Sequence, residues 1–375
     1  MKKISVIIIS VLFFSNSYCQ YTVRLNITQL SAQPKTNVIF VAGSFNNWTP
    51  NDEDNKFQQD SAGNFFLNYP RVDSGTYEFK FTRGSWQTVE CKKNGADIEN
   101  RIVTIKSDTV LNFSIESWKD LSMQEPRKHT ASKNVHIIDS AFYIPQLNRH
   151  RRIWIYLPPD YSSSQKKYAV LYMHDGQNLF DEYTAAFGEW GIDEAMDTLS
   201  TSKKSLIVVG IDNGAEKRMS EYNPYEYDRF GKGEGKEYTN FLVSTLKPFI
   251  DAHYRTKKDS AHTYIAGSSM GGLISFYAIL EYPKIFGVAG IFSPAFWTAP
   301  QLNDEVKRKA SSVKGKFYFY AGGSESKTMV SDMQNIIDIL RDNSKAQIKV
   351  EINNEGRHNE TNWRREFPKF YNWIN

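Results

Sequence analysis

Residues 264–277 read YIAGSSMGGLISFY, in which an apolar run, a glycine-rich turn and a helix-like segment follow one another directly. The turn carries the pattern G-x-S-x-G, whose glycines leave room for a sharp turn from a strand into a closely packed helix. We expect Ser269 to present its hydroxyl at the amino terminus of that helix, where backbone N–H groups can stabilise a developing negative charge. A plain glycine-rich turn is the alternative, because a pattern with three fixed positions also arises by chance.

The region around this turn, 135–375, alternates compact apolar runs with amphipathic segments. Repetition of strand, helix and strand predicts an α/β fold with a doubly wound, mainly parallel sheet, whose functional site lies at the carboxyl ends of the strands. The apolar runs are 152–157, 168–173, 206–211, 263–266, 288–292, 317–321 and 348–352, and the amphipathic segments are 238–252, 273–281 and 329–340.

A nucleophilic serine needs a base and an acid, which follow it along the chain in this type of fold as acid and then histidine. His358 is the histidine that comes after Ser269, and it stands between the last apolar run and a predicted terminal helix. A loop in that place lets an imidazole act as general base and then as general acid. Glu325, just past the run 317–321, is the candidate acid, and Asp332 is the alternative.

The second donor of an oxyanion hole is expected in the loop after an early central strand. The stretch 171–180 reads LYMHDGQNLF and changes from apolar to polar at its middle. We expect the backbone N–H groups of Gln177 and Met270 to form the hole. His174 suggests a metal ligand, but no second ligand stands at the right spacing on a shared element, so a structural role is favoured.

The amino-terminal region, 20–117, differs from the rest of the chain. Short alternating runs broken by turn residues predict a small all-β sandwich of the immunoglobulin-like kind. The polar segment 118–134 is the expected linker to the α/β domain, 135–375.

The chain begins with Met-Lys-Lys and an apolar run of about eleven residues, which indicates a signal peptide over 1–19 and export to the periplasm or beyond. Lipidation of Cys19 is the alternative to simple cleavage. Cleavage would leave Cys91 as the only cysteine, so no internal disulfide is expected. A net charge of +4 that includes Lys2 and Lys3 gives no support to nucleic-acid binding, and no run is long enough for a transmembrane segment.

Several stretches, including the serine turn, carry a family resemblance. They are LYMHDGQNLF at 171–180, EWGID at 189–193, VGIDNG at 209–214, GSSMGG at 267–272, FSPAFW at 292–297 and GRH at 356–358. Together they resemble the putative-esterase family of α/β-hydrolases, which includes feruloyl and acetyl-xylan esterases, enterobactin esterases and mycolyltransferases. The resemblance implies a triad of Ser269, Glu325 and His358.

The same resemblance implies that Trp190, Phe296 and Trp297 lie near the substrate cleft. Core packing explains these three aromatic residues equally well.

The amino-terminal domain carries VAGSFNNW at 41–48 and YEFKFTRGSW at 77–86. These stretches resemble the glycogen- and starch-binding modules related to the β subunit of AMP-activated kinase. The resemblance implies that Trp48 and Trp86 stack on sugar rings and that Lys80 adds a polar contact. Residues 87–91 depart from the binding pattern, so a sandwich that only shapes or shields the esterase cleft is the alternative.

The resulting hypothesis is an exported serine carboxylic-ester hydrolase that acts on acetyl or feruloyl esters of carbohydrate through an acyl-enzyme. Such a reaction requires no metal or organic cofactor. The alternatives are a siderophore esterase of the enterobactin type, an acyltransferase with the same residues, and a non-catalytic glycan-binding protein.

Overall fold

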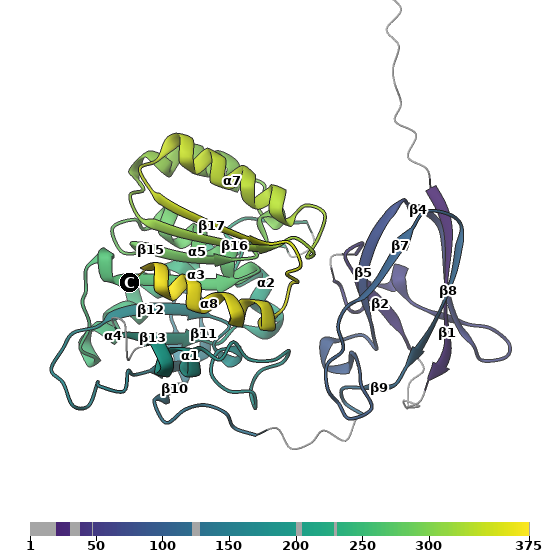
Figure 1. Ribbon diagram of the computed structural model, residues 1–375, viewed down its shortest axis with the longest axis horizontal. Helices are drawn as coiled ribbons and strands as arrows, with labels where there is room; N and C mark the ends of the chain where they lie inside the picture. The colour runs from purple at the N-terminus through teal and green to yellow at the C-terminus, as the bar shows by residue number, and fades with distance from the viewer. Residues whose placement is uncertain are drawn as a thin grey trace, which may run out of the picture. The chain divides into compact units, whose positions relative to one another are not determined.

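The computed structural model describes residues 20–30, 38–46, 48–121, 128–199, 205–228 and 231–374 (Figure 1). The chain forms two compact units, Met1–Pro126 and Arg127–Asn375. The expected signal peptide over 1–19, with Cys19 at its end, lies outside the described residues. Within those described ranges, no helix is both long enough and apolar enough to span a membrane.

The predicted linker, 118–134, is hydrogen-bonded to one unit at each of its ends. The N–H of Lys119 donates to the carbonyl of Val89 (3.0 Å) in the first unit. The N–H of Thr130 donates to the Asp181 carboxylate (3.1 Å) in the second. Both units therefore extend into the segment that its polar composition assigned to a linker.

The first unit is a β-sandwich in which two main sheets share one core, as the alternating pattern predicted. The sheets have the strand orders β3-β4-β1-β8 and β2-β5-β7, and β6 pairs with β9. Alternate residues of β1, including Val23 and Leu25, are buried against Phe79 and Phe81 of β5. The strands are β1 (Gln20–Leu30), β2 (Phe40–Gly43), β3 (Gln58–Gln59), β4 (Phe65–Asp73), β5 (Gly75–Thr82), β6 (Glu90–Cys91), β7 (Arg101–Ile105), β8 (Thr109–Ile115) and β9 (Ser117–Trp118).

The second unit contains an eight-stranded sheet with the order β10-β11-β13-β12-β14-β15-β16-β17. The pairs β10–β11 and β11–β13 are antiparallel, and all later pairs are parallel. The predicted mainly parallel sheet is confirmed. The strands are β10 (Val135–Ile144), β11 (Arg149–Tyr156), β12 (Ala169–His174), β13 (Leu206–Ile211), β14 (Thr263–Ser268), β15 (Val288–Phe292), β16 (Lys316–Gly322) and β17 (Gln347–Asn353).

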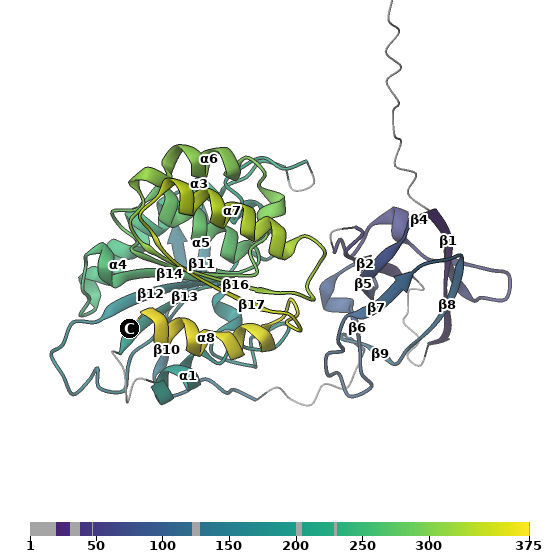
Figure 2. The ribbon, with the colours of Figure 1, turned by 45° about the horizontal axis from the view of Figure 1, so that its top comes forward.

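Helices cover both faces of this sheet (Figures 1 and 2), and each face has its own apolar core. Helices α1 and α8 pack on one face and α3 to α7 on the other, which makes the fold doubly wound. The helices are α1 (Ile192–Leu199), α2 (Arg218–Glu221), α3 (Gly235–Phe241), α4 (Lys247–His253), α5 (Met270–Glu281), α6 (Leu302–Lys309), α7 (Met329–Asn343) and α8 (Glu360–Ile374).

Strand β10 is the element of the sheet that the apolar pattern did not predict. It lies at the edge, and only Phe142 and Ile144 near its end are buried. Every residue of β12, β13 and β14 is buried, because central parallel strands are covered on both faces. A half-exposed edge strand lacks the continuous apolar run that marks a central one.

Candidate active site

Ser269 lies in a strained turn between β14 and α5, as its sequence context predicted. Its backbone has φ 58° and ψ −120°, a region that residues other than glycine seldom occupy. The turn is fixed from both sides: the N–H of Ser269 donates to the carbonyl of Phe292 (2.9 Å), and the N–H of Ala295 donates to the carbonyl of Ser269 (3.0 Å). The end of β15 therefore holds the serine in its unusual conformation.

Close packing accounts for the glycines around Ser269. A Cβ atom on Gly267 would lie 2.8 Å from the backbone of Gly271, and one on Gly272 would lie 3.0 Å from the carbonyl oxygen of Phe292. Helix α5 can approach the sheet closely only without these side chains. All residues of α5 except Glu281 are buried.

The structure brings Glu325 and His358 together, from the loops that follow β16 and β17. His358 Nδ1 lies 2.7 Å from Glu325 Oε2. The Glu325 side chain is 1% exposed and that of His358 is 31% exposed, so the imidazole is accessible while the carboxylate is not. Asp332, the alternative acid, lies in the first turn of α7. The contact with His358 favours Glu325 as the acid.

Two further residues contact this pair, and the sequence-based analysis did not identify them. The Ser293 hydroxyl donates to Glu325 Oε1 (2.6 Å), and the indole N–H of Trp363 donates to the Ser293 oxygen (2.9 Å). Ser293 lies in the stretch 292–297, in which Phe296 and Trp297 were the predicted site residues. Its position directly after β15, next to the strand that carries the acid, was the available signal.

The predicted oxyanion loop follows β12 and is fixed by a partly buried ion pair. Arg218 donates to both carboxylate oxygens of Asp175 (2.6 and 2.9 Å), and Asn213 Nδ2 donates to the same side chain (2.7 Å). Burial alone would raise the pKa of Asp175, but the adjacent guanidinium outweighs it and lowers that pKa. Gln177 is tied to the same loop, because its side-chain oxygen accepts from the N–H of Asn213 (3.1 Å).

The backbone N–H groups of Gln177 and Met270 are both available as donors. In the part of the chain that the structure describes, neither donates to a protein acceptor. Gln177 lies in a short 3₁₀ helix, Gly176–Asn178, and Met270 begins α5 directly after Ser269. Unpaired N–H groups at these two positions are what an oxyanion hole requires.

His174 is buried under this loop rather than presented to a ligand. Its Nδ1 lies 2.9 Å from the hydroxyl of Tyr238, and its ring also packs against Tyr222. Burial lowers the pKa of His174 to about 3, so the imidazole is neutral near neutral pH. Across the described ranges, no three His, Cys, Asp or Glu side chains are grouped so as to hold a metal ion.

The aromatic residues assigned to the substrate cleft differ in exposure. Trp190 and Phe296 are 3% and 4% exposed and belong to the two cores. Trp190 stacks on Trp363 with ring centroids 5.6 Å apart. Trp297 is half-buried and contacts Tyr227 edge-on. Their placement supports core packing for the first two and leaves Trp297 as the candidate for contact with substrate.

In the first unit, Trp48 and Trp86 lie together at the surface. Their ring centroids are 6.3 Å apart and both side chains are half-buried. Lys80 lies on β5 opposite Ala42 of β2 and is also half-buried. The two tryptophans that the resemblance paired are therefore neighbours in the fold.

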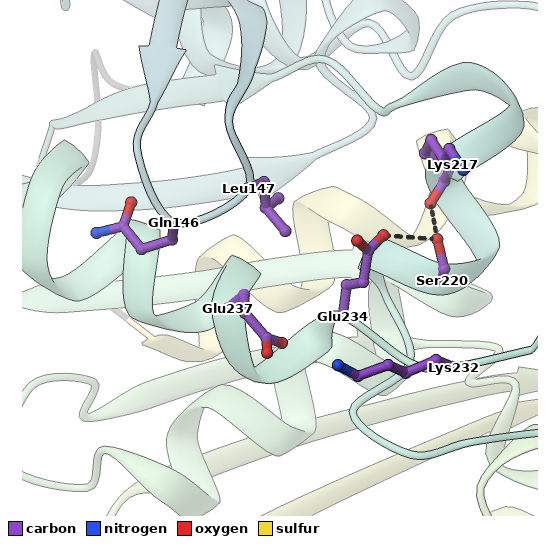
Figure 3. A pocket seen from close by; sticks show the side chains of 7 residues that line it. All are labelled: Gln146, Leu147, Lys217, Ser220, Lys232, Glu234 and Glu237. Atoms are coloured by element: carbon purple, nitrogen blue, oxygen red, sulfur yellow. Dashed lines mark hydrogen bonds between the residues drawn. The ribbon is translucent and has the colours of Figure 1, made fainter.

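A cavity of about 450 Å³ opens beside the turn between β10 and β11 (Figure 3). Ile153 of β11 pairs in antiparallel fashion with Ile211, the last residue of β13. The turn that precedes β11 therefore lies at the carboxyl ends of the parallel strands. The cavity thus lies at the same end of the strands as Ser269, although none of the predicted site residues lines it. Its lining is Gln146, Leu147, Lys217, Ser220, Lys232, Glu234 and Glu237.

Comparison with known proteins agrees with these observations. Residues 144–374 match the family described as putative esterase. The uncharacterized protein YbbA of Bacillus subtilis is 31% identical over 158 residues, which cover 40% of this chain and 58% of YbbA. An endo-1,4-beta-xylanase/feruloyl esterase of Xylanibacter ruminicola is 26% identical over 191 residues, which cover 50% of this chain and 25% of that protein. The matches therefore span less than two thirds of either relative.

The enterobactin esterase FES of Shigella flexneri has a similar structure, with a TM-score of 0.55 and 15% identity. The alignment covers 97% of this chain and 94% of that protein. At this identity the similarity shows a shared fold.

Proposed function

Because this chain belongs to the putative esterase family, we propose that it is an esterase that cleaves its substrate through an acyl-enzyme on Ser269. The observation that carries the proposal is the contact of 2.7 Å between Glu325 and His358, from loops at the sheet edge where Ser269 occupies its strained turn. A glycine-rich turn without catalytic purpose would need neither the strain nor the buried acid.

The contact also fixes which imidazole nitrogen acts. An ionised carboxylate only accepts hydrogen bonds, so Nδ1 of His358 carries the proton that faces Glu325. Nε2 is then free to take the proton of the Ser269 hydroxyl as its oxygen bonds to the ester carbon. The same proton passes to the departing alcohol, and water activated by His358 releases the acid.

The negative charge of the tetrahedral intermediate needs fixed donors. In our proposal it is accepted by the backbone N–H groups of Gln177 and Met270. The Asp175–Arg218 pair keeps the loop of Gln177 in place before substrate arrives, so little reorganisation is needed during the reaction.

We propose an acetyl or feruloyl ester of a carbohydrate as substrate. The Xylanibacter ruminicola relative, an endo-1,4-beta-xylanase/feruloyl esterase, supports a feruloyl ester. An iron(III) salmochelin esterase of Escherichia coli, 26% identical over 157 residues that cover 41% of this chain and 34% of that protein, supports a siderophore ester as the second candidate.

The test compares hydrolysis of p-nitrophenyl acetate, methyl ferulate and ferric enterobactin by the protein and by Ser269→Ala. We expect the variant to lose at least about 10³-fold in kcat on the preferred ester, with its melting temperature retained. Equal activity of both proteins would refute Ser269 as nucleophile. A preference for ferric enterobactin over methyl ferulate would decide for the second substrate.

We also propose that Trp48 and Trp86 offer a stacking surface for a glycan. Aromatic pairs at a surface suit sugar rings because each ring presents an apolar face. Affinity electrophoresis in gels with starch or xylan should show retardation of the protein that is weakened in Trp48→Ala. Equal mobility with and without polysaccharide would support the shielding alternative.

Export is proposed from the charged and apolar pattern of residues 1–19. Amino-terminal sequencing of protein recovered from the periplasm or medium should begin at Gln20. Recovery of an intact amino terminus from the cytoplasm would contradict export.

A further inference from the structure

The carboxylate of Glu325 is held on both oxygens by groups from different elements. Oε2 faces His358, and Oε1 accepts from the hydroxyl of Ser293 (2.6 Å) and from the N–H of Gly322 (2.6 Å). Ser293 is fully buried, and the Glu325 side chain is 1% exposed. Because both groups are buried, water has little opportunity to replace the Ser293 hydroxyl.

The direction of the hydrogen bonds at Ser293 is determined by its partners. An ionised carboxylate has no hydrogen to give, and an indole N–H can only donate. Ser293 must therefore donate to Glu325 and accept from Trp363 (2.9 Å). Because Trp363 occupies the acceptor side of the hydroxyl, the proton of Ser293 is aimed at the carboxylate.

The backbone of Ser293 is as fixed as its side chain. Its φ of 46° lies in the left-handed region, and its N–H donates to the carbonyl of Tyr320 (2.7 Å), which extends the pairing of β15 with β16. The hydroxyl thus reaches the acid from the neighbouring strand. Gly322 reaches the same oxygen from the strand that carries the acid.

Trp363 connects this arrangement to the imidazole. Its ring meets the ring of His358 edge-on, with centroids 5.0 Å apart. It also stacks on Trp190 in the core. One buried indole therefore orients the hydroxyl behind the acid and packs against the base in front of it.

We propose that Ser293 is a positioning residue for ester hydrolysis, which fixes the plane of the Glu325 carboxylate and through it the orientation of His358. The proposal rests on the triad proposed above. A backbone N–H alone on Oε1 would leave the carboxylate free to rotate about its last torsion, which is a soft one. The second donor, from a different strand, removes that freedom.

Ser293→Ala is the first test, with p-nitrophenyl acetate as substrate. We expect kcat to fall roughly tenfold to a hundredfold while KM stays within about twofold, because the lost hydrogen bond is to a charged group that does not touch substrate. Ser275→Ala is the matched control: Ser275 is also fully buried and donates to the carbonyl of Gly271 (2.7 Å) within α5. An unchanged kcat in Ser293→Ala would overturn the proposal.

A double-mutant cycle separates positioning from general structural damage. In a Glu325→Ala background, Ser293→Ala should cause no further loss of kcat, since the group through which it acts is gone. The same fold-loss in both backgrounds would overturn the proposal. Full activity of Glu325→Ala would refute the proposed triad. Loss of activity in Glu325→Ala together with full activity in Ser293→Ala would refute the positioning role alone.

Ser293→Cys covers the case in which the alanine variant does not fold. Cysteine has nearly the same shape and is a weak donor, so kcat should fall with a retained melting temperature. Threonine is unsuitable because a β-branched residue is strained at positive φ. A Ser293→Cys variant with the full kcat would overturn the proposal.

Discussion

Asp175 and Glu325 follow strands of the same sheet and are both buried, each with 6% of the whole residue exposed, yet their partners differ in kind. Asp175 is paired with Arg218, which is always protonated. Glu325 is held by a hydroxyl and a backbone N–H, which are neutral, and by His358, whose charge can change.

The difference indicates two uses of a buried negative charge. A permanent cation beside Asp175 neutralises it at all times, which suits a loop that must stay in place. Neutral donors orient the Glu325 carboxylate without cancelling its charge, so that charge remains available when His358 takes up a proton. The kind of partner, rather than the depth of burial, distinguishes the static carboxylate from the functional one.

Glu325→Gln is expected to have the largest effect. Glutamine keeps the shape and can still accept from Ser293 and Gly322, but its amide would face Nδ1 of His358 and stabilise the wrong tautomer. We expect kcat for p-nitrophenyl acetate to fall by about 10³ to 10⁴. A loss below tenfold, at an unchanged melting temperature, would mean that another group orients the imidazole.

Arg218→Met should act on stability instead, because it leaves the charge of Asp175 buried and unpaired. We expect about 3–5 kcal/mol less unfolding free energy, measured by urea titration. The control is Arg308→Met: the Arg308 side chain is 70% exposed and its pair with Glu305 spans 3.5 Å, so about 0.5 kcal/mol or less is expected. Combining Arg218→Met with Asp175→Asn should restore part of the stability, and no restoration would contradict a charge effect.

The smallest effect is expected at a third buried carboxylate, Asp193, which forms no ion pair with a Lys, Arg or His among the residues that the structure describes. Burial and the adjacent Glu194 carboxylate raise the pKa of Asp193 to about 7. Because the folded protein favours the protonated acid, this residue should lower stability progressively as pH rises from about 4 to about 7, and not further above that. Asp193→Asn should therefore raise the melting temperature by a few degrees at pH 8 and less at pH 5, as measured by calorimetry.

An equal shift at both pH values would contradict the raised pKa of Asp193. The N–H of Ser132 donates to the Asp193 carboxylate (2.6 Å), and an asparagine oxygen can still accept this bond. The comparison of the two pH values thus isolates the charge.

Sequence patterns predicted those elements whose surroundings are uniform. Strands β12, β13 and β14 are apolar throughout because both faces are covered, and the turn at Ser269 is marked by glycines that packing requires. The edge strand β10 gave no such run, since most of its residues are exposed. A continuous apolar run identifies only a strand that is covered on both faces. The other edge strand, β17, was predicted because Ile348, Val350 and Ile352 alternate with polar residues.

The candidate site was predictable only in part, for a similar reason. Chain order pointed to Glu325 and His358, which the structure brings into contact. The support by Ser293 and Trp363 joins residues 70 positions apart, and no spacing along the chain signals such a contact. The family resemblance placed Trp190 near the cleft, with core packing as the alternative, and its burial against Trp363 depends on the packing of α8.

The positive φ at Ser269 restricts which substitutions can follow in evolution. A threonine there would offer the same hydroxyl, but its branched side chain is strained at φ 58°. Cysteine has no such branch. This turn is thus compatible with sulfur in place of oxygen at the nucleophile, whereas a threonine nucleophile would need a different turn.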